Sequence, residues 1–247
     1  MASSWSANTI KSLDEVRGQD TESVAQQNIA SEPTSKTQRP SEVTPMTRNQ
    51  NLQACSDGEL SKLQALFTKL DISPGHPPIK PQHYGQESVG GSLPFTSEML
   101  EVATRNRHPP IISHIFTTFP TTSVSHSVVS AAIEHKDISI FSLLLAQDPT
   151  ILNRELGDYQ GPPLSFAVWG SDPSFANYLL DKGADPNLGG FGPVSNLCLA
   201  VSGQPVELIR KMVERGADVH DEAAMKQAMK AGRKDVVECL VHAATRT

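Results

Sequence analysis

The 247-residue sequence has few aromatic residues, few cysteines and no long apolar run. Its three cysteines include no C-x-x-C pair, which excludes a disulfide framework or a zinc knuckle and favours a reducing compartment. No apolar run approaches the roughly 18 residues that a membrane span requires, and the N-terminus lacks the apolar core of a secretory signal. A net charge of −6 without a clustered basic face argues against direct nucleic-acid binding. We therefore expect an intracellular protein, cytoplasmic or nuclear, that is neither secreted nor membrane-bound.

The sequence also lacks the motifs that carry chemistry. Its eight histidines are scattered, and no pair has metal-ligand spacing such as H-E-x-x-H. There is no G-x-S-x-G nucleophile elbow, no P-loop and no G-x-G-x-x-G after a strand. The glycine-rich run at 189–192 follows no parallel strand. We expect no enzymatic activity, no catalytic or metal-binding residue, no cofactor and no small-molecule substrate.

The first part of the chain is predicted to hold little structure. Ser, Thr and Gln make up 21 of residues 1–57, and such a segment buries too little apolar surface to offset the entropy lost on ordering, so we expect a disordered tail. Leucines and Phe67 recur at steps of three and four over 58–71, which predicts one amphipathic helix. That helix either packs on the folded domain or docks into a partner's groove. Residues 72–95 are rich in proline and glycine and are predicted to be a linker.

A recurrence at an interval of 33 residues organises the rest of the chain. The string LLDKGADPN at 179–187 returns as MVERGADVH at 212–220, which calls for a search for internal repeats. An alanine stands 16 residues before the glycine of each string. Three further alanines stand at similar intervals before and after these two, and each marks another copy of the repeat. The five alanines are Ala103, Ala132, Ala167, Ala200 and Ala228. All twenty positions that lie 8, 9, 12 and 13 residues after them are apolar.

That spacing predicts one apolar face of a helix after each alanine. Pro109, Pro173 and Pro205 stand just before three of these faces, where proline is tolerated as the first helical residue. Gly183 and Gly216 suit the left-handed conformation that ends a helix. Each copy is therefore predicted to be a short first helix that carries the alanine, a tight turn, a second helix and a loop. One such pair leaves a face unburied, so the units must stack on their neighbours.

These residues resemble the ankyrin repeat family. PPLSFA at 162–167 matches the family's T-P-L-H-x-A opening at proline, leucine and alanine. The string at 179–187 resembles the family's L-L-L-x-x-G-A-D-V-N ending, and GRKDVVECLV at 232–241 resembles its second helix. The resemblance covers about five units over residues 96–244. It implies an all-α solenoid of stacked helix-turn-helix units, preceded by the disordered tail and the one short helix.

The sequence departs from the family in two respects. The histidine that ties adjacent loops together in the family is absent from every unit, so we expect a less regular array with long loops at 117–127 and 146–160. The last unit is short and carries Lys226 and Lys230 together with further basic residues, which predicts a polar C-terminal cap.

The resemblance implies a non-catalytic scaffold or adaptor that binds a partner protein through a concave face. The family's exposed positions follow the alanine by two or three residues or lie in the loop before it. Carried over to this chain, they are Glu134, His135, Trp169, Ser202 and Lys230, with Asp158, Tyr159, Phe191 and Val194 from the loops. Exposed aromatics are frequent interface hot spots, although Trp169 and Phe191 are equally compatible with filling gaps between irregular units. The alternative function is a transcription co-regulator that acts through protein partners without contacting DNA.

Overall fold

The computed structural model describes residues 45–80, 94–157, 161–170, 173–190 and 192–245, all within one compact unit that spans Pro40–Thr247. The described residues fold into α-helices joined by loops, with one short 3-10 helix, which confirms the all-α prediction. The helices come in consecutive pairs. These are α1 (Pro45–Asp57) with α2 (Leu60–Lys69), α3 (Thr96–Arg105) with α4 (Pro109–Thr118), α5 (His126–Glu134) with α6 (Ile138–Gln147), α7 (Pro163–Trp169) with α8 (Pro173–Asp181), α9 (Asn196–Val201) with α10 (Val206–Glu214), and α11 (Glu222–Lys230) with α12 (Lys234–Ala244). The 3-10 helix, Pro149–Leu152, follows α6.

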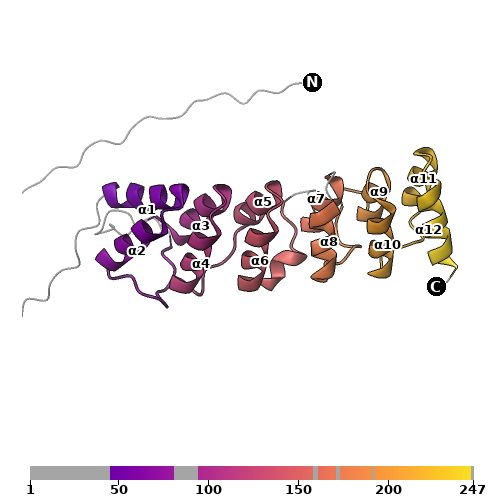
Figure 1. The fold of residues 1–247 in the computed structure, drawn as a ribbon. Helices are drawn as coiled ribbons and strands as arrows, with labels where there is room; N and C mark the ends of the chain where they lie inside the picture. The colour runs from indigo at the N-terminus through magenta and orange to yellow at the C-terminus, as the bar shows by residue number, and fades with distance from the viewer. Residues whose placement is uncertain (1–44, 81–93, 158–160, 171–172, 191, 246–247) are drawn as a thin grey trace, which may run out of the picture. The chain divides into compact units, whose positions relative to one another are not determined.

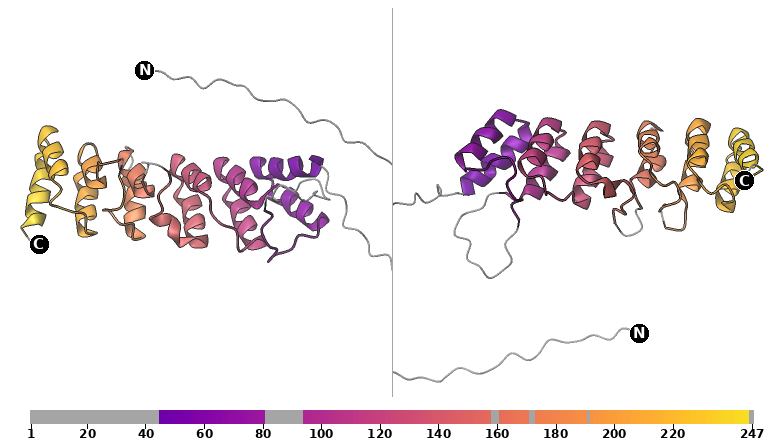
Figure 2. Two further views of the ribbon diagram at one scale, coloured as in Figure 1. Left: turned by 180° about the vertical axis from the view of Figure 1, so that it is seen from behind. Right: turned by 90° about the horizontal axis from the view of Figure 1, so that it is seen from below.

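The pairs follow one another in chain order and form two layers (Figures 1 and 2). The first helix of each pair contacts the first helices of the neighbouring pairs, from α1 through to α11. Contacts between second helices join α2 to α4, α4 to α6, α8 to α10 and α10 to α12. The stacking of helix pairs predicted from the repeat is therefore confirmed.

The repeat alanines lie where the sequence register places them. All five are in first helices and are at most 4% exposed. Each first helix contacts its own second helix, so a larger side chain at these positions must push two helices apart. The apolar positions of the second helices form the other half of the core. The exceptions to full burial are Phe116, Leu145, Val213 and Val237, which are half-buried, and Val241, which is exposed.

The two glycines of the repeated strings end α8 and α10. Gly183 and Gly216 both have a φ of +93°, the left-handed region that glycine adopts at no steric cost. The amide of Ala184 donates to the Leu179 oxygen at 3.0 Å, and that of Ala217 donates to the Met212 oxygen at 2.9 Å. This is the hydrogen-bond pattern of a glycine-terminated helix, so the recurrence of Gly-Ala-Asp reflects a helix ending.

Asparagines tie successive loops together in the absence of the family's histidine. Asn187 donates from Nδ2 to the Gly216 oxygen at 2.7 Å and accepts from the Asp218 amide at 2.9 Å. One unit earlier, the Asp185 amide donates to Oδ1 of Asn153 at 3.0 Å. Each bond joins loops that are about thirty residues apart in the sequence, so the loss of the histidine does not leave the loops of these units unconnected.

The prediction of a disordered tail up to residue 57 was wrong for residues 45–57, which form α1. This helix contacts α2 and α3. Its buried residues include Asn51, Ala54 and Cys55, and Arg48 forms a two-pronged ion pair with Glu98 of α3 at 2.6 and 2.7 Å. The pattern was missed because the buried side chains are small or polar. Residues 1–44 lie outside the described residues.

The helix predicted over 58–71 is α2, and it is one half of a pair with α1. It buries Leu63 and Phe67 and contacts α4, where the Phe67 ring stacks on His114 with centroids 5.6 Å apart. His108 of the next pair contacts the Ser56 oxygen through Nε2 at 2.8 Å. Of the two alternatives for this helix, the structure has it packed on the folded domain.

Candidate partner-binding surface

Five of the predicted partner-binding residues lie at the C-terminal ends of first helices. Glu134, Trp169 and Lys230 are the last residues of α5, α7 and α11, while His135 and Ser202 follow α5 and α9 directly. All five are exposed. Because α5, α7, α9 and α11 are consecutive neighbours in one layer, these residues share one side of that layer. We call this set the first-helix surface.

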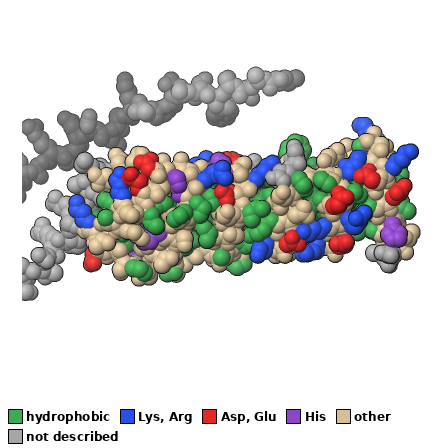
Figure 3. All heavy atoms as spheres, in the orientation of Figure 1, with side chains coloured by type: hydrophobic (Ala, Val, Ile, Leu, Met, Phe, Trp, Pro, Cys, Tyr) green, Lys and Arg blue, Asp and Glu red, His purple; other side chains and the backbone are tan. Residues whose placement is uncertain are grey.

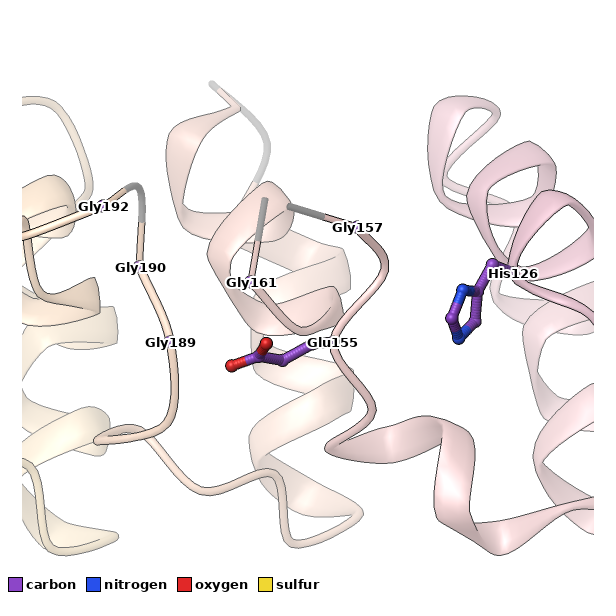
Figure 4. A pocket seen from close by; sticks show the side chains of 7 residues that line it. All are labelled: His126, Glu155, Gly157, Gly161, Gly189, Gly190 and Gly192. Atoms are coloured by element: carbon purple, nitrogen blue, oxygen red, sulfur yellow. The ribbon is translucent and has the colours of Figure 1, made fainter. Parts of the chain in front are cut away.

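The loop residues of the prediction are described only in part. Val194 lies before α9 and is half-buried. Asp158, Tyr159 and Phe191 lie outside the described residues. Their sequence neighbours line a cavity of about 730 Å³, shown in Figure 4. The lining residues are His126, Glu155, Gly157, Gly161, Gly189, Gly190 and Gly192.

Backbone forms much of the cavity of Figure 4, because five of the seven described residues that line it are glycines. Gly190 has a φ of +130°, and a Cβ atom there would meet the Val194 oxygen at 1.9 Å, so no other residue fits the loop as it stands. The side chain of Glu155 brings a carboxylate to the cavity (Figure 4). A carboxylate repels phosphate, so this glycine-rich wall is poorly suited to cradling one.

Three predicted residues line a second groove, of about 520 Å³, between α7 and α9. We call it the Trp169 groove. Its lining residues are Val168, Trp169, Gly170, Val194, Cys198, Leu199, Ser202, Gly203, Gln204 and Gln227. Trp169, Val194 and Ser202 were predicted from the repeat register, and the groove brings them together.

Trp169 is 69% exposed, the largest exposed fraction among the large exposed hydrophobic side chains of the described residues. The gap-filling alternative therefore does not hold for this residue. Its neighbour Val168 points the other way and is 2% exposed. Since successive helical residues project about 100° apart, the burial of Val168 in the stack directs Trp169 outward.

Gln204 forms the base of the groove and was not predicted from the sequence. Its side chain is buried, and Nε2 donates to the Val168 oxygen at 2.7 Å and also to the Gly170 oxygen. Both carbonyls lie at the C-terminal end of α7, where a helix leaves carbonyl groups without intrahelical partners. Arg233 in turn donates to the main-chain oxygen of Gln204 at 3.0 Å, so the base of the groove is fixed by three successive units.

The described residues that line the Trp169 groove are uncharged, since none of them is acidic or basic. Burial, followed by the nearby Asp221 carboxylate, raises the pKa of the Cys198 thiol. The thiol is therefore protonated at neutral pH. Charges lie beside these residues instead, with Lys136 next to Gly170 and Asp221 near Cys198. Further out, Glu134 lies on the α5 side and Lys230 on the α11 side. The groove is thus suited to a neutral, partly apolar group.

The second-helix layer has a different character. Asp181 of α8 pairs with Lys211 of α10 at 2.8 Å and with Arg215, which directly follows α10, at 3.0 Å. Figure 3 shows basic and acidic side chains gathered over these two helices. Among the described residues, no three His, Cys, Asp or Glu side chains are grouped as a metal-ligand set. Within the same part of the chain, every helix is too short or too polar to cross a bilayer.

Comparison with known proteins identifies the fold. No family model and no curated protein sequence matches the chain. Among solved structures, an ankyrin repeat domain from Acinetobacter baumannii AYE is similar with a TM-score of 0.57 at 13% identity, over 78% of this chain and 97% of that one. The ankyrin repeat domain of human ASB11 has a TM-score of 0.52 at 17% identity, over 78% and 96%. That of Bcl-3, a member of the IkappaB protein family, has a TM-score of 0.52 at 17% identity, over 78% and 97%.

These similarities show that the chain has the ankyrin repeat fold, as the sequence motifs predicted. At 13–17% sequence identity, these structures show only how the helices are arranged. Which side chains contact a partner has to be inferred from this chain itself. The Trp169 groove is such a feature, because it depends on a tryptophan, a buried glutamine and an uncharged stretch that belong to two particular units.

Proposed function

We propose that the protein is a non-catalytic adaptor that binds a partner protein through the Trp169 groove and the adjoining first-helix surface. The observation that carries this proposal is the exposure of Trp169, at 69%, beside a groove whose described lining residues are all uncharged. Exposed apolar surface surrounded by polar residues is typical of protein interaction sites. Helices α7, α9 and α11 hold half of the lining residues, and the side-chain hydrogen bonds of Gln204 fix the base, so little ordering entropy is lost when a partner binds.

The groove indicates the chemistry of the partner segment. An aliphatic or aromatic side chain matches the walls formed by Val168, Trp169 and Leu199, and neutral hydrogen-bonding groups match Ser202 and Gln227. Lys230 lies on the α11 side and makes no ion pair with a described residue. We therefore expect an apolar anchor in the groove, with an acidic residue of the partner toward Lys230.

A further similar structure supports the class of function. It contains the endopeptidase Bd0816 from Bdellovibrio bacteriovorus in complex with the immunity protein Bd3460, and it matches with a TM-score of 0.54 at 15% identity, over 78% of this chain and 97% of that one. A fold of this kind therefore occurs in a structure of two proteins bound to each other, which is the mode of action proposed here.

Photo-crosslinking from within the groove tests the proposal. A photoreactive phenylalanine analogue at position 169 is expected to crosslink a discrete partner in cell extract. The same analogue at Leu188, a 42% exposed apolar residue outside the groove, is the matched control and is expected to give no such product. Equal crosslinking from both positions, or none from position 169, would contradict the assignment of the groove.

A substitution measures how much the tryptophan contributes. Trp169→Ser is expected to weaken binding of the crosslinked partner by about 2 kcal/mol or more, roughly a 30-fold loss of affinity, as is usual for a hot-spot tryptophan. The exposed position means that the fold is retained, which circular dichroism checks. An unchanged affinity would remove Trp169 from the interface.

The alternative role, a transcription co-regulator that acts through protein partners, stays a prediction. It requires the same binding surface and differs in location and in the identity of the partner. Nuclear accumulation of a tagged chain, together with a transcription factor as the product crosslinked from position 169, would favour it. An exclusively cytoplasmic chain would favour the adaptor.

A further inference from the structure

The last helix pair, α11 with α12, exposes residues whose counterparts in the earlier pairs are buried. The residue after the repeat alanine is Thr104, Ile133, Val168 or Val201 in the four preceding units, and each is at most 6% exposed. In the last unit the same position is Met229, which is 61% exposed. In the four earlier units the first helix contacts the first helix of the following pair, whereas the main contacts of α11 among the described residues are with α9 and α12.

Two further positions of the last pair show the same difference. The residue three before the alanine is buried in the four earlier units, as Leu100, Val129, Leu164 and Leu197, whereas Met225 is only half-buried. Val241 of α12 is 49% exposed, while the corresponding Leu180 of α8 is buried and Phe116, Leu145 and Val213 of the other units are half-buried. Met225, Met229 and Val241 lie together in a shallow groove of about 530 Å³, with Val219 and Ala244 at its edges. We call this surface the end face.

The end face corrects the prediction of a polar cap. Lys226, Lys230 and Lys234 are exposed as expected, yet the face between α11 and α12 is apolar. The group that fits such a face is another helix-pair surface with exposed apolar side chains.

The opposite end of the stack is different. Asn49 and Gln53 of α1 and Lys62 and Gln64 of α2 are exposed, and none of the large exposed hydrophobic side chains among the described residues lies in either helix. Stacking the end face of one copy on α1 and α2 of another would cover methionines with polar side chains. Apposition of two end faces about a two-fold axis instead buries apolar surface on both sides.

The edge of the end face is compatible with this self-association. It carries both signs of charge, and Lys226 pairs with Glu222 at 3.0 Å. A surface that carries both signs allows Lys226 of one copy to lie opposite an acidic side chain of a rotated second copy. Methionine side chains are flexible and adapt to an opposing apolar surface. We propose that the protein forms a two-fold homodimer through the end face, with Met229 and Val241 of each copy packed against the same face of the other.

The dimer is tested on the full chain by sedimentation velocity over a range of concentrations. The unmodified protein is expected to show a reversible monomer–dimer equilibrium. Met229→Lys is expected to raise the dimer dissociation constant at least tenfold, and Val241→Lys serves as a second variant at the other end of the face. Because both side chains are exposed within one copy, the substitutions leave the monomer folded, which circular dichroism verifies. Leu188→Lys, an exposed apolar position elsewhere, is the matched control and is expected to dimerise normally.

A mixing experiment identifies the contact as two-fold. Met229→Glu is also expected to be monomeric, and an equal mixture of the Met229→Lys and Met229→Glu proteins is expected to regain the dimer through opposite charges. An unmodified chain that is monomeric at every concentration overturns the proposal, and so does a dimer that survives both substitutions. Trp169→Ser is expected to dimerise like the unmodified protein, so the dimer and the partner-binding groove succeed or fail separately.

Discussion

Gln204→Ala is the substitution that most directly tests how the Trp169 groove is built. The side chain donates two hydrogen bonds to carbonyl groups at the end of α7, those of Val168 and Gly170, from a position that is 2% exposed. Removing it leaves both carbonyls without this donor. Leaving a buried polar group unpaired costs about 1–3 kcal/mol, and the Gly170 end of the site is only partly buried.

The expected loss is reduced by one opposing effect. Oε1 of Gln204 is buried and has no hydrogen-bond partner among the described residues, so the substitution also removes an unsatisfied acceptor. We therefore expect a net loss of about 2 kcal/mol in the free energy of unfolding. For a domain of this size 1 kcal/mol corresponds to about 2–4 °C, which predicts a decrease in Tm of roughly 4–8 °C.

Gln227→Ala is the matched control, because Gln227 lines the same groove but is half-buried and donates only to the exposed hydroxyl of Ser202. Its loss is expected to change stability by less than about 0.5 kcal/mol. Thermal denaturation followed by circular dichroism compares the two variants. Equal Tm values for both would refute the view that Gln204 clamps α7 onto α9, and with it the assignment of a rigid base to the groove.

Three further predictions concern the core and its titratable groups. Ala228→Leu is expected to destabilise the fold by about 1–3 kcal/mol by overpacking the buried helix crossing. Ala223→Leu, on the exposed side of α11, is the control and is expected to leave the stability unchanged; urea denaturation compares the two variants. Burial lowers the pKa of His114, so the unfolded chain binds the proton more readily and stability falls as pH decreases through the unfolded value of about 6.5; in His114→Phe this part of the pH dependence of unfolding should disappear. Burial raises the pKa of Cys55 to about 12, so a thiol reagent at pH 8 should label Cys239 in the folded protein and Cys55 only after unfolding.

The repeat register was predictable from the sequence because it is a packing constraint. A buried alanine at the crossing of two helices and a glycine with a left-handed φ can be replaced by few other residues, so the same residue types recur from unit to unit of this chain. They also located Trp169, whose exposure follows from its place two residues after the alanine. The register therefore indicated which residues lie on the first-helix surface without any knowledge of a partner.

Features that belong to a single unit were not predictable. Gln204 lies four residues after its alanine, where the other units have Arg107, Lys136 and Gly232 among the described residues, so no periodicity marks it. The buried face of α1 depends on Asn51, Ala54 and Cys55, a set too polar and too small to register as an apolar stripe. Both features depend on tertiary contacts with neighbouring units, and a pattern read along one helix does not contain them.

The absence of charge from α7 and α9 leads to a final prediction about the physical nature of partner binding. These two first helices contain no acidic or basic residue, whereas α3, α5 and α11 each contain at least one charged or titratable side chain. If the Trp169 groove provides most of the binding free energy, apolar burial dominates, and salt screens that term very little. If Glu134 and Lys230 on its flanks dominate instead, binding must weaken as the Debye length falls from about 10 Å at 0.1 M salt to about 3 Å at 1 M.

Crosslinking from position 169 separates these cases when it is repeated between about 0.05 and 0.5 M sodium chloride, a range over which exposed ion pairs are progressively screened. We expect the yield to change less than twofold, and Lys230→Ala to leave it nearly unchanged at high salt, because an exposed ion pair contributes only about 0–1 kcal/mol. A tenfold fall in yield would mean that the flanking charges hold the partner. The uncharged surface of α7 and α9 would then be a consequence of how these units pack, and the proposed anchor in the groove would have to be abandoned.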